Sequence, residues 1–561
     1  MFVSVTRQVA MQGLSPELTA AIKLQRSGKV KEAEQVYRQL LNHVSQALQA
    51  HSALGVLLSS QGRLAEARGH YQKVLEQEPG DLVARKLLAD TYSEEGDVES
   101  SAEHYRELAE SQPEAWLWKL RADIASPTAF TSNAAIDEYR LQLQDRLTAY
   151  QQSPHGIDLD ELAGSACKPP LSLAYHGRDD RPLKEQFAAI FAERLPAELP
   201  RCGTGKPHVG FVVTEGNEGV FLRGMAGVLD RLDSRQLRVS VICSPRAEGK
   251  FKAAVRRDLE YVFTASRFST TIENVRNAGC DLLYFWEIGT DCTNYFLPFF
   301  RLAPVQCTSW GWPVTSGIAD VDYFLSSELL DPPGAEQHYT EKIVRLKHLP
   351  NYYPLPRYQV DADRVRLGIG DKEHIYFCGQ NPRKLHPDFD ELMGRILRSD
   401  AQGVVALVQA AKPFITAALQ ARFERTLPDC ANRIRWVPRM TQGEYLSWMA
   451  AADCVLDTPH YCGGANSTYD AFAVDAPVVT LTGAFHRGRY TTAAYRTMGI
   501  EDCIAASADG YSEIAVRLAT DSDFRRSMQQ KIRERRSALF DNAHAVGELE
   551  RFFCEAIAST R

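Results

Sequence analysis

The front of the chain repeats itself at one fixed offset. A glycine, a tyrosine and a small residue each recur every 34 residues. The members of these sets are Gly28, Gly62 and Gly96; Tyr37, Tyr71 and Tyr105; and Ala21, Gly55 and Ala89. A period of this length is typical of a short helical unit that can bury its apolar face only against its neighbours. The sequence therefore predicts a stack of helix pairs at the front of the chain.

A period of 34 residues, with a glycine at the turn inside each unit, is the tetratricopeptide pattern. We expect about three repeats over residues 15–117, followed by a helical and irregular linker over 118–205. Stacked repeats form a curved surface that commonly grips peptides, so a protein or peptide partner is expected.

Composition argues against several classes of function. A formal net charge of −7 does not suit a protein that coats nucleic acid. No apolar run reaches the length of about 18 residues that predicts a membrane span. The start, MFVSVTRQVAMQGLSPE, has neither a basic region nor a long apolar region, so a cytoplasmic protein is expected. The 12 cysteines are scattered singly without a CxxC pair, which argues against a zinc site or a disulfide framework.

The second half alternates apolar, β-rich runs with helical segments. One series starts at HVGFVVTE (208–215) and a second at IYFCGQ (375–380), with the link HLPNYYPLP between them. Strands that alternate with helices of about ten or more residues imply parallel sheets. We therefore expect two doubly wound, Rossmann-like domains, over 206–350 and 351–561. Ligands of such domains bind at the carboxyl ends of the strands.

One stretch, GGANSTYDAF (463–472), combines glycines, small polar residues and a carboxylate between two strand-like runs. The polar residues 466–468 are expected to cap a helix that begins near Tyr469. Free N–H groups at a helix N-terminus form an anion site, and the two glycines allow a phosphate close to the backbone. Asp470, one turn into the helix, could accept hydrogen bonds from a ribose. A capped helix without any ligand is the commoner case, so the pattern alone leaves that alternative open.

A second stretch, CGQNPRKLHPDF, places Lys384 just beyond a predicted strand and before a helix. There it could reach a diphosphate and neutralise the charge that develops on a leaving nucleotide. An isolated lysine at such a position is more often a solvated surface charge. Its expected position beside the loop at 463–472 makes it a candidate.

Several motifs together resemble a known family. They are APVQCTSWGWPVTSGIADVDYFLSS, NPRKLHP, DCVLDTPHYCGGANSTYDAF and GRYTTAAYRTMGI, in this order behind the repeats. They resemble the O-GlcNAc transferases and SPINDLY-like proteins of glycosyltransferase family 41, over most of 206–561. The resemblance implies a GT-B fold of two facing Rossmann-like domains. It also implies a nucleotide sugar as donor, no metal and no further cofactor, and protein side chains as acceptors.

The resemblance implies roles for the residues that match the family's motifs. Lys384 aligns with the lysine that stabilises the departing diphosphate, and Asp470 with the aspartate that binds the ribose. Arg439 and Met440 fall where backbone groups read the uracil, and Tyr445 replaces a histidine that stacks on the base. The implied nucleotide-sugar site comprises Gln380, Asn381, Arg439, Met440, Tyr445, Gly464, Asn466, Ser467, Thr468 and Asp470.

The sequence departs from the family near the acceptor. Where the family carries a histidine once proposed as general base, the stretch GFVVTEGNEGVFLRGM has Gly219. Glu215, Glu218 and His176 are candidates for that base, with ordinary loop residues as the alternative. Arg223 aligns with an arginine of the related adhesin N-glucosyltransferases. The sugar or acceptor pocket so implied comprises Arg223, Pro313, Thr315, Ser316 and Gly317.

These observations predict an inverting, metal-independent transfer of GlcNAc or another hexose from a UDP-sugar to Ser or Thr of a protein. Transfer of glucose to asparagine and GDP-sugar-dependent O-fucosylation remain alternatives within the enzyme class. An inactive peptide-binding scaffold is the alternative from another class. Gly219 favours the scaffold and the phosphate-site residues favour the enzyme. The sequence leaves the formation of a homo-oligomer open.

Overall fold

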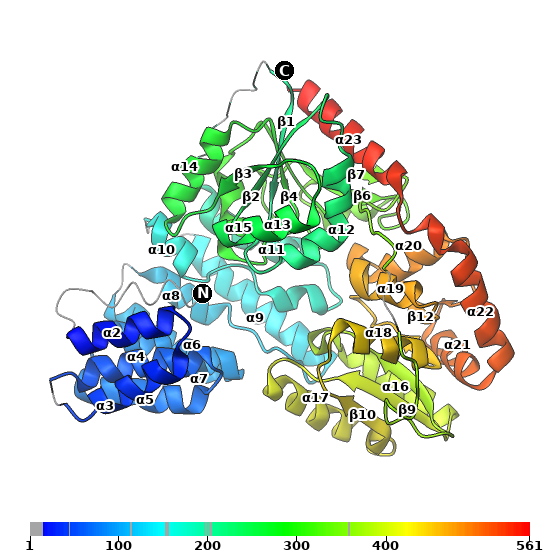
Figure 1. The fold of residues 1–561 in the computed structure, drawn as a ribbon, viewed down its shortest axis with the longest axis horizontal. Helices are drawn as coiled ribbons and strands as arrows, with labels where there is room; N and C mark the ends of the chain where they lie inside the picture. Colours follow the sequence, from blue (N-terminus) through cyan, green and yellow to red (C-terminus); the bar gives the residue numbers. More distant parts are fainter. Residues whose placement is uncertain are drawn as a thin grey trace. The chain divides into compact units, whose positions relative to one another are not determined.

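The computed structural model describes residues 15–43, 45–112, 115–151, 156–195, 197–198, 200, 203, 205–356 and 360–560 (Figure 1). Residues 1–14, which hold most of the N-terminal stretch considered above, lie outside these ranges. The described chain divides into two compact units. One comprises residues 15–127 and 156–167, and the other comprises residues 128–151 and 168–560. The predicted fold class, helical repeats followed by two Rossmann-like domains, is confirmed.

The first unit consists of consecutive antiparallel helix pairs. Its helices are α2 (Pro16–Arg26), α3 (Val30–Leu40), α4 (Ala47–Ser60), α5 (Leu64–Gln77), α6 (Leu82–Glu95), α7 (Val98–Ser111), α8 (Trp116–Asp123) and α10 (Leu159–Gly164). The repeated glycines Gly28, Gly62 and Gly96 lie at the turn within each pair, with φ of 83°, 76° and 83°. Only glycine adopts this left-handed conformation without a steric cost, which explains the conserved spacing within the chain.

The repeated tyrosines and small residues pack against one another. Tyr71 is fully buried, and a Cβ atom added to Gly55 would lie 2.5 Å from its ring. The small residue in α4 therefore makes room for the aromatic ring of α5. Ala21 and Tyr37 are likewise fully buried in the first repeat. The period seen in the sequence is the period of these contacts.

The second unit contains two parallel sheets. In the first, the strands are β1 (His208–Val212), β2 (Arg238–Cys243), β3 (Glu260–Phe263), β4 (Leu282–Phe285), β5 (Val305–Thr308), β6 (Tyr323–Ser327) and β7 (Lys342–Leu346), in the order β3-β2-β1-β4-β5-β6-β7. Its helices include α12 (Glu218–Arg231), α13 (Glu248–Ala254), α14 (Phe268–Ala278) and α15 (Cys292–Phe296). The order reverses at β1 and β4, and at such a switch point the loops diverge and leave a crevice.

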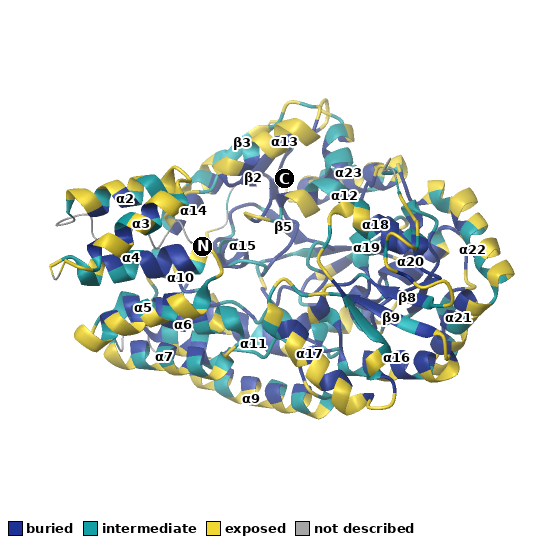
Figure 2. Cartoon of the chain, turned by 60° about the horizontal axis from the view of Figure 1, so that its bottom comes forward, coloured by how far each residue is buried: buried dark blue, intermediate teal, exposed yellow. Residues whose placement is uncertain are grey.

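The second sheet has the order β10-β9-β8-β11-β12-β13. Its strands are β8 (His374–Cys378), β9 (Gly403–Val408), β10 (Ile434–Val437), β11 (Cys454–Leu456), β12 (Val478–Leu481) and β13 (Ile504–Ala505). The accompanying helices are α16 (Pro387–Ser399), α17 (Pro413–Thr426), α18 (Gln442–Ala451), α19 (Gly464–Ala473), α20 (Tyr490–Thr497), α21 (Ala508–Thr520) and α22 (Ser522–Arg535). Strands β8 and β9 are dark blue in Figure 2, whereas the surrounding helices expose one face. Such two-sided burial is why these strands read as continuous apolar runs.

The last helix, α23 (Ala543–Ala558), returns from the second domain to the first (Figure 1). The ring of Phe553 packs against those of Phe211 on β1 and Tyr284 on β4, with centroids 5.9 Å and 6.0 Å away. The chain before β1 also belongs to this unit, where α11 (Arg181–Ala192) packs against α9 (Asn133–Gln151). No helix in the described part of the chain is long and apolar enough to cross a membrane.

Candidate active site

The carboxyl edge of the second sheet faces the first domain across a cavity of about 270 Å³. Most of its lining comes from the segments that follow β9, β10 and β11. Arg223 of α12 reaches it from the first domain. The lining residues are Arg223, Val408, Arg439, Met440, Thr441, Gln442, Tyr445, Asn466, Ser467 and Asp470. The cavity thus brings together Arg223 and six of the ten residues expected to bind the nucleotide sugar.

Lys384 lies at the end of a short 3₁₀ turn, Pro382–Lys384, directly after β8. Its Nζ donates to Gln380 Oε1 at 3.0 Å and to the Cys462 carbonyl at 2.9 Å. It also lies 4.6 Å from the ring centroid of Tyr461. Burial lowers the pKa of the Lys384 ammonium, which is less stable away from water. An ammonium has three donors, so these two bonds leave one for a ligand.

The loop at 463–472 is helical over a longer stretch than the sequence predicts. α19 begins at Gly464, with φ of +63°, and not near Tyr469. The residues expected to cap the helix therefore lie in its first turn, and the prediction of a side-chain cap is wrong. Glycines at both starting positions let the helix begin earlier, because neither has a Cβ to restrict the turn.

The polar residues of this first turn have partners of their own. Asn466 Oδ1 accepts a bond from the Tyr353 hydroxyl at 2.6 Å, and Ser467 Oγ lies 3.2 Å from the Tyr445 hydroxyl, within hydrogen-bond distance. Thr468 is buried and bonds Thr491, so its hydroxyl faces the protein interior. The first turn of α19 thus presents its N–H groups and two polar side chains at the cavity, where an anion is favoured.

Tyr445, on α18, also lines the cavity. Its hydroxyl donates to the Gly379 carbonyl at 3.2 Å. A Cβ atom at Gly379 would lie 2.5 Å from the Tyr445 ring, so this glycine permits the close approach of ring and backbone. Arg439 and Met440 line the same end of the cavity. A flat ring beside backbone groups can stack on a base while those groups hydrogen-bond to its edge.

Asp470 is buried and forms an ion pair with Arg223, whose Nη2 lies 2.5 Å from Asp470 Oδ1. The two residues come from α19 and α12, so the pair joins the two Rossmann-like domains. A ribose that binds Asp470 must share this carboxylate with Arg223 or displace it.

The candidate bases occupy different environments. Glu215 is exposed, 3.9 Å from Arg246. Glu218 begins α12 and is buried, and its carboxylate bonds Lys250 Nζ at 2.9 Å. Neither lines the cavity.

His176 is also buried, with its ring packed against Phe130 and Tyr139 at centroid distances of 4.6 Å and 5.8 Å. Burial lowers the pKa of His176 to about 2, so its imidazole is neutral. It lines a separate small cavity with Tyr175 and His386, so the structure does not bring it to the 270 Å³ cavity between the two Rossmann-like domains.

The loop Pro313 to Gly317 is tied to the first domain's interior. Ser316 N donates to Glu341 Oε1 at 2.6 Å, and Thr315 Oγ1 donates to Glu341 Oε2 at 2.7 Å. Gly317 has φ of +75°, and a Cβ there would lie 2.5 Å from the Lys184 backbone. Pro313 and Thr315 line another small cavity. None of the five residues of this loop lines the 270 Å³ cavity described above.

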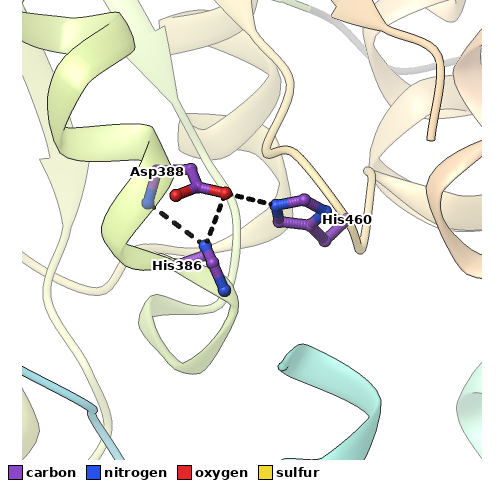
Figure 3. Close-up of side chains that lie close together, drawn as sticks. All are labelled: His386, Asp388 and His460. Carbon is purple, nitrogen blue, oxygen red and sulfur yellow. Dashed lines mark hydrogen bonds and ion pairs between the residues drawn. The ribbon is translucent and has the colours of Figure 1, made fainter. Parts of the chain in front are cut away.

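His386, Asp388 and His460 form a cluster of side chains (Figure 3). It is the one group of three or more potential metal ligands in the described part of the chain, with ligand atoms within 4.8 Å of one another. Asp388 Oδ2 accepts from His460 Nε2 at 2.7 Å, and His386 Nδ1 accepts the Asp388 amide at 3.1 Å. Interactions of its carboxylate with the His386 and His460 side chains hold the pKa of Asp388 far below its usual value.

The atoms that a cation would need are thus already engaged within the protein. His386 follows Lys384 by two residues, and His460 precedes by two the Cys462 carbonyl that holds Lys384. We interpret the cluster as a brace that fixes these two loops against each other.

Comparison with known sequences assigns the second domain. Residues 353–549 match the profile of glycosyl transferase family 41, and residues 18–81 and 58–124 match tetratricopeptide profiles. The second Rossmann-like domain belongs to glycosyl transferase family 41. With the exception of Arg223, every residue that lines the cavity lies in this family 41 domain.

Curated relatives and a solved structure agree with this assignment. The probable UDP-N-acetylglucosamine–peptide N-acetylglucosaminyltransferase SPINDLY of Solanum lycopersicum is 28% identical over 263 residues, covering 45% of this chain and 27% of that protein. The corresponding protein SEC of Arabidopsis thaliana is 26% identical over 270 residues, covering 45% and 26%. The chain thus spans about a quarter of the length of these relatives. A variant of the O-GlcNAc transferase of Thermobaculum terrenum covers the whole chain, and 99% of its own, with a TM-score of 0.68 and 20% identity, so it shares the fold of the family 41 domain and its neighbours.

Some residues of this site were not identified from the sequence. Tyr353, Tyr461 and the Cys462 carbonyl contact the residues expected at the phosphates, and Gln442 lines the cavity. Tyr461 and Cys462 lie in the motif DCVLDTPHYCGGANSTYDAF, so the sequence already indicated that they belong near the site. Their contact with Lys384 depends on the pairing of β8 with β11, which the motif does not contain.

Proposed function

We propose that this protein transfers N-acetylglucosamine or another hexose from a UDP-sugar to a Ser or Thr hydroxyl of a protein. The observation that carries the proposal is the cavity at the carboxyl edge of the second sheet. It combines an aromatic ring for a base, a buried carboxylate for a ribose and a helix N-terminus for phosphates. The names of the curated relatives point to the same donor class.

In the proposed reaction the acceptor oxygen attacks the anomeric carbon from the face opposite the diphosphate, which inverts the configuration. The bond from that carbon to the diphosphate breaks as the new bond forms. Lys384 and the first turn of α19 stabilise the charge that develops on the leaving diphosphate. The two acceptors that hold Lys384 keep its third donor directed at one place, so little reorganisation is needed during the step. Because the protein's own groups supply this charge, transfer is expected to persist in the presence of a chelator.

A transfer assay tests the proposal. The protein would be incubated with UDP-N-acetylglucosamine or UDP-glucose and a peptide library, and modified peptides would be identified by mass spectrometry. Lys384→Ala should lower kcat by about 10²–10³-fold, as expected when one donor to a developing charge is removed. Lys372→Ala, which removes an exposed lysine of the same domain, serves as the control and should leave the rate unchanged.

The outcomes separate the proposal from its alternatives. Transfer to asparagine, or transfer from a GDP-sugar only, would replace the acceptor or the donor. A folded protein that transfers nothing from any nucleotide sugar would favour the peptide-binding scaffold. Normal turnover by Lys384→Ala would contradict the role of Lys384.

A further inference from the structure

A buried carboxyl group lies at the carboxyl edge of the first sheet, where the proposed acceptor would enter. Glu287 follows β4 and is 3% exposed. β4 pairs with β1, so the loops after these two strands are neighbours. Gly219, the position at which the sequence lacks the family's histidine, is the second residue of α12, directly after the loop that follows β1. Glu287 therefore lies beside the part of the molecule in which a base is missing.

Hydrogen bonds fix one oxygen of Glu287 and leave the other available. Asn217, two residues before Gly219, donates from Nδ2 to Glu287 Oε2 at 2.8 Å. Oε1 is buried and accepts no bond of standard geometry from the residues that the structure describes. Oε1 is therefore the oxygen of Glu287 that has room for a further donor.

The surrounding polar groups form a rigid support. Thr214 Oγ1 lies 3.0 Å from Thr290 Oγ1 and accepts a bond from Asn294 Nδ2 at 3.0 Å. These residues come from the loop after β1, the loop after β4 and helix α15. Thr214 also interacts with the Glu287 carboxyl through its hydroxyl and its amide, so it links the carboxyl group to this network.

Glu287 also acts across the gap between the two Rossmann-like domains. Tyr461, on the second domain, is the ring that lies 4.6 Å from Lys384 Nζ. Burial raises the pKa of the Tyr461 phenol most strongly, and the charge of Glu287 is among the groups that raise it further. Glu287 is thus one of the charged groups that influence the ring beside the proposed leaving-group lysine.

Its environment gives Glu287 the acidity of a catalytic group. Burial raises the pKa of the Glu287 carboxyl to about 8, hydrogen bonds from Thr214 and Asn217 oppose this, and the charge of Asp291 adds to it. Burial raises the pKa of Asp291, Lys168 lowers it and Glu215 raises it. The Glu218 carboxylate is paired with Lys250. A carboxyl group that titrates near the working pH can both accept and release a proton efficiently.

From these observations we infer that Glu287 is the general base of the transfer reaction, in place of the missing histidine. The inference rests on the proposed function. Glu287 Oε1 would accept the proton of the acceptor hydroxyl while the hydroxyl oxygen bonds the anomeric carbon. The bond between that carbon and the diphosphate oxygen breaks, and its electron pair leaves with the diphosphate beside Lys384. Glu287 then releases the proton to water, so the step is balanced without a further reactant.

Glu287→Gln tests this inference in the full chain, with UDP-N-acetylglucosamine and an acceptor peptide found by the transfer assay. The variant keeps the shape and the bond to Asn217 but cannot accept a proton. We expect kcat to fall by about 10²–10⁴-fold, while the Kd for UDP, measured by calorimetry, stays unchanged. The wild type should gain activity as pH rises toward 8, and the variant should lose this dependence. Glu273→Gln, an exposed acid on α14, is the control and should keep both rate and pH profile.

The outcomes distinguish this inference from the function on which it rests. If the wild type transfers sugar and Glu287→Gln does so at a similar rate with the same pH profile, the inference is overturned and the function stands. If the wild type neither binds UDP nor transfers sugar, both are overturned. If Glu287→Gln does not fold, Glu287→Asp decides. A lowered kcat with a displaced pH profile would support the inference, and a wild-type kcat and profile would overturn it.

Discussion

Individual charged residues of the cavity are held by partners from distant parts of the chain. Lys384 is fixed by Gln380 and by the Cys462 carbonyl, and Asp470 is paired with Arg223. The types of these residues could be predicted from the sequence, because a lysine, a carboxylate and a helix start are what a nucleotide diphosphate requires. Their partners could not, since Arg223 and Asp470 are 247 positions apart and only the folded domains bring them together.

The ring of Tyr445 gives a prediction about nucleotide affinity. Tyr445→Ala removes the stacking surface at the base end of the cavity and should weaken the binding of UDP by about 1–3 kcal/mol, or roughly 5- to 150-fold. Tyr445→Phe keeps the ring and should bind UDP with nearly wild-type affinity. Calorimetric titration of both variants measures this. Equal affinities for Tyr445→Ala and the wild type would remove Tyr445 from the base pocket.

The raised pKa of Glu287 gives a prediction about stability that requires no substrate. In the unfolded chain an ordinary glutamate ionises near pH 4.3, whereas folded Glu287 keeps its proton until about pH 8. Between these values the folded state binds one more proton, so its stability falls as pH rises, by about 1.4 kcal/mol per pH unit. Glu287→Gln does not titrate and should lose this decrease.

Urea unfolding of both proteins at pH 5.5 and pH 7 measures the difference between their free energies of unfolding. We expect Glu287→Gln to gain stability relative to the wild type between these two values of pH. A difference that stays constant would show that Glu287 ionises normally and would contradict its burial as a neutral group.

Whole helices and strands followed the sequence closely, and the exceptions have physical causes. The 34-residue period and the alternating apolar runs gave the repeats and both sheets, because they reflect burial of whole faces. The start of α19 was placed too late, since the polar residues 466–468 resemble a cap although Gly464 already begins the helix. The loop Pro313 to Gly317 is bonded to Glu341 and Lys184, which the sequence could not predict because these contacts are tertiary. Its expected place at the sugar stays a prediction.

The repeat helices offer a matched pair of glycine substitutions. Gly55→Ala would place a Cβ 2.5 Å from the buried Tyr71 ring and should destabilise the repeats by about 1–3 kcal/mol. Gly69→Ala, on the outer side of α5, meets no atom within 4 Å and should be neutral or stabilise by about 0.5–1 kcal/mol. Thermal unfolding followed by circular dichroism compares them. A Gly55→Ala protein as stable as Gly69→Ala would contradict the packing described here.

On the scale of the molecule, the two Rossmann-like domains contribute different parts of the proposed chemistry. The second domain contains almost the whole nucleotide cavity, whereas the first contributes Arg223 and, in our inference, Glu287. The order of repeats and domains could be predicted from the chain. The ion pair between α12 and α19 and the return of α23 to β1 and β4 could not, because each depends on how complete domains pack.

The central claim is that the cavity lined by Tyr445, Ser467 and Asp470 binds the nucleotide of a UDP-sugar. Calorimetric titration of the full chain with UDP and, in parallel, with GDP tests it most directly. We predict micromolar binding of UDP, weaker binding of GDP, and a loss of affinity for UDP in Asp470→Asn, because the ribose loses a charged acceptor. Absence of binding by UDP, or equal affinity of Asp470→Asn and the wild type, would contradict the account.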